Sequence, residues 1–309
     1  MSFQIVPATR QGVKPLICPF SESGCGKTMS SLLLARGIAG PSGLIVMGDS
    51  ESRRGSLYAD VIPGGFSTFD IEPPFSPQRY IEAVDAIEAS GADVGIIDSG
   101  SHEWEGISGV LDMAGENELK SGKPGLHNWK IPKLEHAKFV QRLLRTKIPF
   151  IVCLRAKFKS RQSKNERGKT EIVKDDFTSP IQAEDFIFEA TAHFEIMGDH
   201  SIRLTKCSHP DLRKCFPEKG PIEIRHGELI AQWANGGKSS QATFQPKDDA
   251  KNARAILWKD AKKAGLKDGS ELEKLCHERD ILDADKSLAD LDAKDVQYIH
   301  DWLKKEWSK

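Results

Sequence analysis

Short apolar runs bounded by Gly, Pro or Asp alternate with amphipathic stretches through the first half of the chain. Runs of this kind are typical of buried strands, whereas apolar residues spaced three and four apart are typical of helices. Alternating strands and helices form βαβ units, which build a parallel sheet. The expected strands are residues 13–18, 44–47, 94–97 and 150–154, and the expected helices are residues 28–38, 77–89 and 134–145.

The next part of the chain carries apolar runs with no helical pattern between them. Closely spaced strands usually pair antiparallel. The sequence therefore predicts an α/β fold in which a mainly parallel central sheet is extended by antiparallel strands at residues 188–197, 202–205, 222–224 and 229–233.

The composition changes near residue 235. Residues 235–249 are polar and rich in Gly, Ser and Gln, which is typical of a linker. The remaining residues have Leu, Ile and Trp on one helical face and charged residues on the other. We expect an α/β domain over residues 1–234, a linker over 235–249, and a small helical domain over 250–309 with helices at 253–264, 270–279 and 292–305.

The bulk composition narrows the class of protein. Charged residues make up 29% and the net charge is −1, so nucleic-acid binding would need a local basic patch. No apolar run approaches the roughly 18 residues that span a bilayer, and no secretory signal is visible at the start. The six cysteines are scattered, which favours reduced thiols. We expect a cytoplasmic protein with no membrane partner.

The strongest chemical signal lies between the first expected strand and the first expected helix, in the segment Ser21-Glu22-Ser23-Gly24-Cys25-Gly26-Lys27-Thr28. This context fits a Walker A loop, which turns backbone N–H groups toward phosphates, reaches the β and γ oxygens with a lysine and ligates Mg²⁺ with a hydroxyl. Ser21 departs from the pattern, because a glycine that tolerates positive φ normally stands there. The candidate ATP-binding residues are Ser23, Gly24, Cys25, Gly26, Lys27 and Thr28.

A second segment, Val94-Gly95-Ile96-Ile97-Asp98-Ser99, is an apolar run that ends in a carboxylate. An aspartate at a strand end can simply cap a turn. Combined with Lys27 and Thr28, however, it fits a Walker B segment that holds Mg²⁺. Thr28 and Asp98 are therefore the candidate metal ligands.

These motifs, with Asp49-Ser50-Glu51 and the strand that ends at Arg155, resemble the RecA-like recombination ATPases over roughly residues 13–206. Within that group the chain is most similar to the phage Sak-type single-strand-annealing ATPases. The resemblance implies a RecA-like P-loop NTPase fold, Mg-ATP hydrolysis and action on single-stranded DNA. It also implies a homo-oligomeric ring or filament, a single-strand-binding or annealing protein as a possible partner, and the host cytoplasm if the chain is phage-encoded.

The resemblance also assigns catalytic roles. Glu51 would orient and polarise the attacking water, as the glutamate of a D-x-E segment does in the RecA-like group, although a solvated turn residue is the alternative. His102 and Glu103 follow Asp98 closely and remain reserve candidates. Arg155 stands where relatives usually carry Gln or Asn as a γ-phosphate sensor, so it serves either as the sensor or as an ion-pair partner.

A basic stretch follows Arg155 over residues 156–169. It resembles a flexible DNA-contacting loop of RecA-like recombinases, with cations for phosphates and an aromatic ring for base stacking. A solvated lysine-rich loop is the alternative. Lys206 resembles the lysine that such subunits send to a neighbour's nucleotide. The candidate DNA-binding residues are Lys157, Phe158, Lys159, Arg161 and Lys164.

The sequence thus favours an Mg-ATP-dependent ATPase that acts on single-stranded DNA in annealing or strand exchange. A nucleotide or small-molecule kinase and a non-catalytic nucleotide-dependent switch remain alternatives, since both share the loop. The helical domain is either a packing module or a tail like those of phage recombination proteins.

Overall fold

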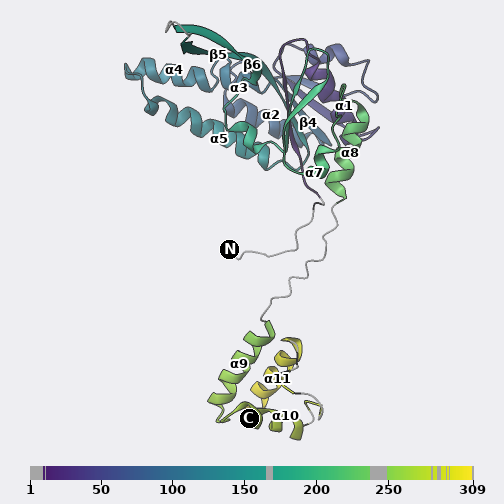
Figure 1. The fold of residues 1–309 in the computed structure, drawn as a ribbon, viewed down its shortest axis with the longest axis vertical. Coiled ribbons are helices and arrows are strands. Elements are labelled where there is room, and N and C mark those ends of the chain that lie inside the picture. Colours follow the sequence, from purple (N-terminus) through teal and green to yellow (C-terminus); the bar gives the residue numbers. More distant parts are fainter. Residues whose placement is uncertain are drawn as a thin grey trace. The chain divides into compact units, whose positions relative to one another are not determined.

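The computed structural model describes residues 10–307, apart from residues 11, 165–169, 237–248, 280, 284–286, 290 and 292. The described residues form two compact units, 10–236 and 249–307 (Figure 1). The first unit is an α/β structure built on one mixed sheet. The second is helical.

The sheet runs in the order β3-β2-β4-β5-β1-β7-β8, with β6 paired to β5. Neighbouring strands from β3 to β7 are parallel, and the β7–β8 and β5–β6 pairs are antiparallel. This confirms the mainly parallel sheet with antiparallel extensions. The strands are β1 Leu16–Ser21, β2 Ile45–Asp49, β3 Ser67–Asp70, β4 Val94–Asp98, β5 Phe150–Lys164, β6 Thr170–Pro180, β7 Ala192–Ile196 and β8 Ile202–Cys207.

Helices cover both faces of the sheet (Figure 1). On one face lie α1 (Lys27–Ala39) and α8 (Ile224–Asn235), and on the other lie α2 (Pro77–Ala89) and α5 (Lys130–Leu144). Each face has its own buried apolar cluster. The shorter elements are η1 Arg54–Tyr58, α3 Ser101–Glu105, α4 Val110–Ser121, η2 Leu126–Trp129, α6 Phe186–Glu189 and α7 Pro210–Arg213.

The strands expected at residues 222–224 and 229–233 are wrong, because this segment forms α8. The buried residues of α8 are spaced as on one helical face: His226, Gly227, Ile230 and Ala234. Gly227 also lets α8 approach α1 closely, since an added Cβ there would lie 2.2 Å from the Leu34 carbonyl oxygen. The expected strand at 188–197 is shorter, because α6 ends at Glu189 and β7 begins at Ala192.

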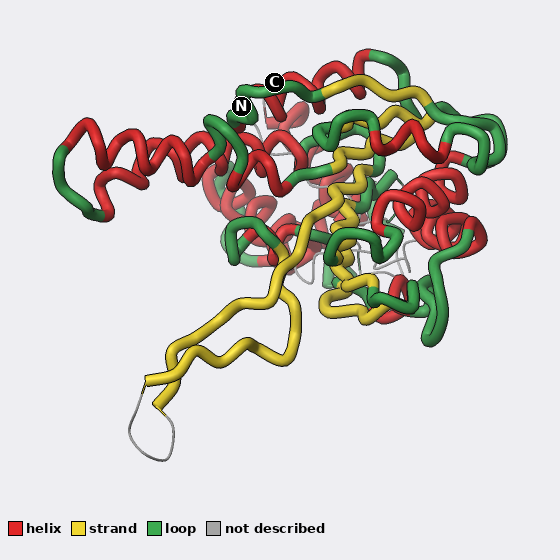
Figure 2. Tube along the Cα trace, turned by 90° about the horizontal axis from the view of Figure 1, so that it is seen from above, coloured by secondary structure: helices red, strands yellow, loops and turns green. Residues whose placement is uncertain are grey.

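The flexible loop expected at residues 156–169 is also wrong for its described part. Residues 156–164 continue β5 and pair antiparallel with β6, with a register shift between Phe158 and Ser160. Backbone pairing with the β-prone residues of β6, such as Ile172 and Phe177, replaces the solvated loop. Figure 2 shows this hairpin projecting from the rest of the sheet.

The second unit contains α9 (Asp249–Lys263), α10 (Gly269–Glu278) and α11 (Ala293–Trp307). Their apolar faces meet in a separate core that includes Leu257 and Leu272. Asp268 caps α10 by accepting a hydrogen bond from the Glu271 backbone N–H. These helices lie close to the ranges that the periodicity predicts.

Candidate functional site

The carboxyl ends of four parallel strands meet at one edge of the sheet. The registers align Asp49 with Asp98, and Ser21 with Arg155. Ligands of open α/β sheets bind at this edge. A cavity of about 560 Å³ opens there, and we call it the loop cavity; its lining includes Ser23, Gly24, Gly26, Lys27, Thr28, Glu51, His102 and Arg155.

The loop from β1 to α1 depends on two glycines. Gly24 and Gly26 both have φ of +89°, a left-handed conformation that glycine adopts without strain. Gly26 immediately precedes α1, whose N-terminus receives no side-chain cap. The free backbone N–H groups at the start of α1 therefore favour an anion. Ser21 ends β1 and does not have positive φ, so the conformation that favours glycine is not required at this position.

Cys25 does not line the cavity, unlike the other predicted residues of this loop. Its carbonyl oxygen lies 2.9 Å from Nδ1 of His200, which stands in the turn between β7 and β8. The His200 ring also packs against Gly26, where an added Cβ would lie 3.0 Å from Nδ1. His200 was not predicted from the sequence; the turn residues Gly198 and Asp199 beside it are the only local signal.

Lys27 and Asp98 are buried beneath the loop, and Thr28 beside them is half-buried. The Thr28 hydroxyl donates to Asp98 Oδ2 at 2.6 Å, and Lys27 Nζ lies 3.8 Å from Asp98 Oδ1. Asp98 is 2% exposed and does not itself line the loop cavity, and its Oδ1 has no hydrogen-bond partner among the described residues. Burial raises the pKa of Asp98 to about 6, although Lys27 and Thr28 act in the opposite direction.

Glu51 is held at the cavity by the turn that follows β2. The Asp49 carboxylate accepts hydrogen bonds from the backbone N–H groups of Glu51, at 2.6 Å, and Gly55, at 2.8 Å. The Glu51 carboxylate lies 3.8 Å from the Arg54 guanidinium. Within the D-x-E segment, Asp49 therefore shapes the turn and Glu51 lines the cavity.

A polar chain links Arg155 to the ends of β2 and β4. Arg155 Nη1 lies 3.2 Å from His102 Nε2, and His102 Nδ1 lies 2.9 Å from Ser50 Oγ. Since a guanidinium only donates, His102 Nε2 accepts and Nδ1 carries the proton. Burial and the Arg155 charge lower the pKa of His102, which favours this neutral form. Ser50 Oγ also accepts from the Ser99 N–H at 2.8 Å.

Glu103 lies apart from this site. It is fully buried and does not line the loop cavity. Both carboxylate oxygens contact His136 Nδ1, at 3.0 and 3.1 Å, and Gln182 Nε2 donates to Glu103 at 3.2 Å. His136 was not predicted from the sequence, because it lies within an ordinary amphipathic helix, α5.

Two of the predicted DNA-binding lysines on the hairpin have acidic neighbours. Lys157 lies 3.7 Å from Glu105 and Lys159 lies 2.8 Å from Glu184. Phe158 is 41% exposed. Arg161 and Lys164 lie in the paired backbone of β5, and their side chains fall outside the described part of the structure.

Lys206 is engaged within its own chain. Its ammonium donates to the carbonyl oxygens of Ile187, Phe188 and Ala190, at the end of α6. A reach toward a neighbouring subunit would have to break these bonds. The interface role stays a prediction.

Three further findings bear on function. Within the described residues, no group of three or more His, Cys, Asp or Glu side chains is placed to hold a metal ion. No described helix is both long and apolar enough to cross a membrane. No protein-family model matches the chain, and no match is found among curated proteins.

Proposed function

We propose that the loop cavity binds and hydrolyses ATP with Mg²⁺, and that the protein is a RecA-like P-loop ATPase acting on single-stranded DNA. One observation carries the proposal. The hydroxyl of Thr28 and the buried carboxylate of Asp98 are 2.6 Å apart beside Lys27, directly beneath a loop with two left-handed glycines. A buried charged pair at a cavity is costly unless a ligand uses it.

The residues fit an Mg²⁺ ion with a nucleotide. Asp98 Oδ1 is a buried carboxylate oxygen with no hydrogen-bond partner among the described residues. Magnesium usually takes one or two carboxylates and completes its shell with phosphate oxygens and water, so Asp98 and Thr28 suffice as protein ligands. When bound, the ion would neutralise charge that develops on the β and γ phosphates.

Three side chains of the cavity would then have the remaining roles in ATP hydrolysis. Lys27 is buried and positively charged; burial alone would lower its pKa, but the Asp98 carboxylate raises it above the ordinary value. It would pair with the phosphates. Glu51 would hold the attacking water, and Arg155, fixed by His102, would contact the γ-phosphate.

Action on single-stranded DNA is supported by the resemblance to phage annealing ATPases and by the projecting β5–β6 hairpin. Lys157 and Lys159 are both exposed on this hairpin. The hairpin begins on the strand that carries Arg155, so it continues directly from the proposed γ-phosphate contact. Annealing or strand exchange is the process we propose.

The test is the rate of ATP turnover with and without single-stranded DNA, in Mg²⁺ and in EDTA. We expect Mg²⁺-dependent phosphate release that single-stranded DNA stimulates. Phosphate transfer to a small-molecule acceptor would instead favour a kinase. Tight ATP binding with negligible turnover would favour a nucleotide-dependent switch.

A further inference from the structure

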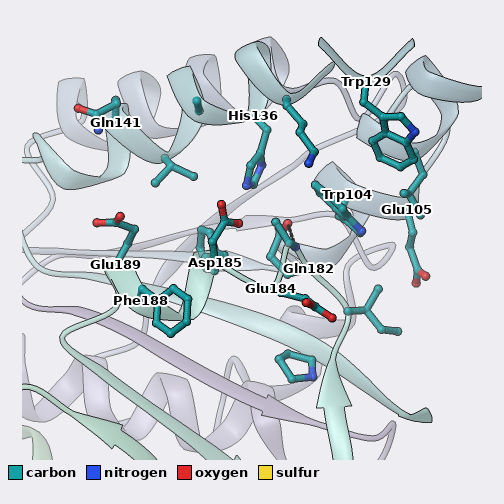
Figure 3. A pocket seen from close by; sticks show the side chains of 18 of the residues that line it. Trp104, Glu105, Trp129, His136, Gln141, Gln182, Glu184, Asp185, Phe188 and Glu189 are labelled. Carbon is teal, nitrogen blue, oxygen red and sulfur yellow. Dashed lines mark hydrogen bonds between the residues drawn. The ribbon is translucent and has the colours of Figure 1, made fainter. Parts of the chain in front are cut away.

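A second cavity, of about 920 Å³, has no role in the proposed hydrolysis; we call it the aromatic pocket. Its walls come from α3, α4, η2, α5, β5 and residues 180–189. The Trp104 and Trp129 rings lie side by side in its wall, with centroids 6.5 Å apart. Figure 3 shows both indoles at one end of the pocket, and Phe188 and Glu189 at the other. The pocket therefore has an aromatic end, where Glu105 also lies, and an opposite end that carries Glu189, with Glu184 and Asp185 between them.

A buried acceptor lies between these two ends, on His136, which points from α5 toward the pocket (Figure 3). Its Nδ1 donates to the Glu103 carboxylate, which leaves Nε2, the acceptor nitrogen of this tautomer, for a ligand. That Nε2 is buried and has no hydrogen-bond partner among the described residues. The adjacent Gln182 cannot serve it, because its amide already bonds to Gly100, Glu103 and Ala183.

Three lysines line the pocket: Lys133, Lys157 and Lys159. The last two pair with Glu105 and Glu184. Lys133 is exposed and makes no ion pair within the described residues. It follows Trp129 by about one helical turn, since η2 leads directly into α5. A cation with no ion pair among the described residues thus stands about one turn from Trp129, while Glu105 at the same end pairs with Lys157.

We propose that the aromatic pocket binds one unpaired nucleotide of single-stranded DNA. The base stacks against Trp129 and Trp104, an N–H of its edge donates to His136 Nε2, and its phosphate pairs with Lys133. This inference rests on the proposed function, because it names where that DNA enters the protein.

The chemistry of the pocket favours a nucleobase over a peptide side chain. Every base has a flat face that stacks on aromatic rings, and every base carries an N–H donor on its edge. An apolar side chain of a partner protein would fill the aromatic end but leave His136 Nε2 unsatisfied, which is costly in a buried site. A phosphate also gives Lys133 the partner that it lacks in the described structure.

The test compares an oligothymidylate with an abasic oligonucleotide of the same length, bound to the full chain. Trp129→Ala should weaken binding of the base-bearing strand about fivefold or more and leave the abasic strand unchanged. Lys133→Ala should weaken both strands about equally. Lys120→Ala, on the neighbouring α4, is the matched control because Lys120 is exposed and does not line the pocket. Thermal unfolding checks that each variant is folded.

Each other outcome has a separate meaning. Equal losses for both strands in Trp129→Ala would overturn base binding and leave ATP hydrolysis untouched. If both variants bind DNA normally but have a lower molecular mass in solution than the unmodified protein, the pocket is instead a contact with a second copy of the chain. If the unmodified protein binds neither strand, the DNA part of the proposed function fails together with this inference, whereas ATP turnover is judged on its own.

Discussion

Two buried carboxylates, Asp98 and Glu103, lie close in the sequence but differ in their hydrogen-bond partners. Asp98 accepts from Thr28 through one oxygen, and its other oxygen has no hydrogen-bond partner among the described residues. Glu103 contacts His136 through both oxygens and also accepts from Gln182. Because buried polar groups are normally paired, the incomplete one marks the place where a ligand is expected.

The difference separates a site for chemistry from a site for positioning. Asp98 lies under the loop cavity with Lys27, where charge can be completed by a cation and phosphates. Glu103 instead orients His136 in the wall of the aromatic pocket. Burial alone therefore does not distinguish the two carboxylates, whereas the oxygen of Asp98 without a hydrogen-bond partner among the described residues does.

The largest expected effect comes from removing the cation beside Asp98. Lys27→Ala should reduce ATP turnover about 10³-fold, the upper scale for losing one group that stabilises transition-state charge. Phosphate release measures the loss, and Lys130→Ala, an exposed lysine outside the loop cavity, should have no effect. Full turnover in Lys27→Ala would contradict the proposed site.

A stability measurement tests whether burial of the ionised Asp98 carboxylate lowers the free energy of unfolding. Its pKa is raised to about 6, so between about pH 4 and 6 the folded state binds a proton more tightly than the unfolded state. Its contribution to the free energy of unfolding is therefore complete below that range and is lost as the pH rises through it. The loss amounts to about 3 kcal/mol.

Urea unfolding without Mg²⁺ measures this contribution. Asp98→Asn stays neutral and should lack the fall in the free energy of unfolding from pH 4 to 6, so it should be more stable than the unmodified protein at pH 7. Glu103→Gln is the companion variant, and it should keep the fall in the free energy of unfolding because it leaves Asp98 in place. The same fall in Asp98→Asn and in the unmodified protein would mean that Asp98 is not the carboxylate responsible.

Glu51 and Glu103 give the next contrast. Glu51→Gln should keep ATP binding and slow turnover by about 10²-fold, the usual scale for losing a general base. Glu103→Gln should leave turnover nearly unchanged, because the Glu103 carboxylate is bonded to His136 and Gln182 and not to the residues of the proposed nucleotide site. Single-turnover hydrolysis separates binding from chemistry. The reverse pattern would transfer the water-activating role to Glu103.

The order of strands and helices around the loop cavity was predictable from the sequence. Strongly periodic segments specify their own structure, and α2 spans the residues expected for it. Residues 229–233 were mistaken for a strand because short apolar runs look alike in helices and strands, and the close approach of Gly37 and Gly227 appears only in three dimensions. The four-residue strand β3 and the helix α4 were not predicted.

The residues of the candidate site were predictable where they close an apolar strand segment, as at Asp98, which ends β4, and Arg155, after which β5 continues to Lys164. Their partners were not, because these come from distant segments. His136 reaches Glu103 from α5, and His200 reaches the loop from the turn after β7. The hairpin was missed because its basic composition suggested solvent exposure, whereas pairing with β6 determines its backbone.

The smallest effect concerns Glu105, whose side chain lies near residues of both regions. Glu105 lies 4.0 Å from Arg155 of the loop cavity and 3.7 Å from Lys157 of the aromatic pocket. Exposed ion pairs of this kind contribute about 0.2 to 1 kcal/mol, which corresponds to fivefold at most in a rate ratio. Glu105→Gln should therefore change the ratio of DNA-stimulated to basal ATP turnover by up to about fivefold.

The control for this link is Glu184→Gln. This change frees Lys159, and Glu184 makes no ion pair with Arg155 among the described residues. It should alter DNA affinity slightly and leave the ratio of stimulated to basal turnover unchanged. Both variants need the same salt concentration, because screening weakens exposed pairs. If Glu105→Gln and Glu184→Gln behave alike, the two regions are energetically independent, and DNA stimulation must pass through another path, such as the backbone of β5 between Arg155 and Lys157.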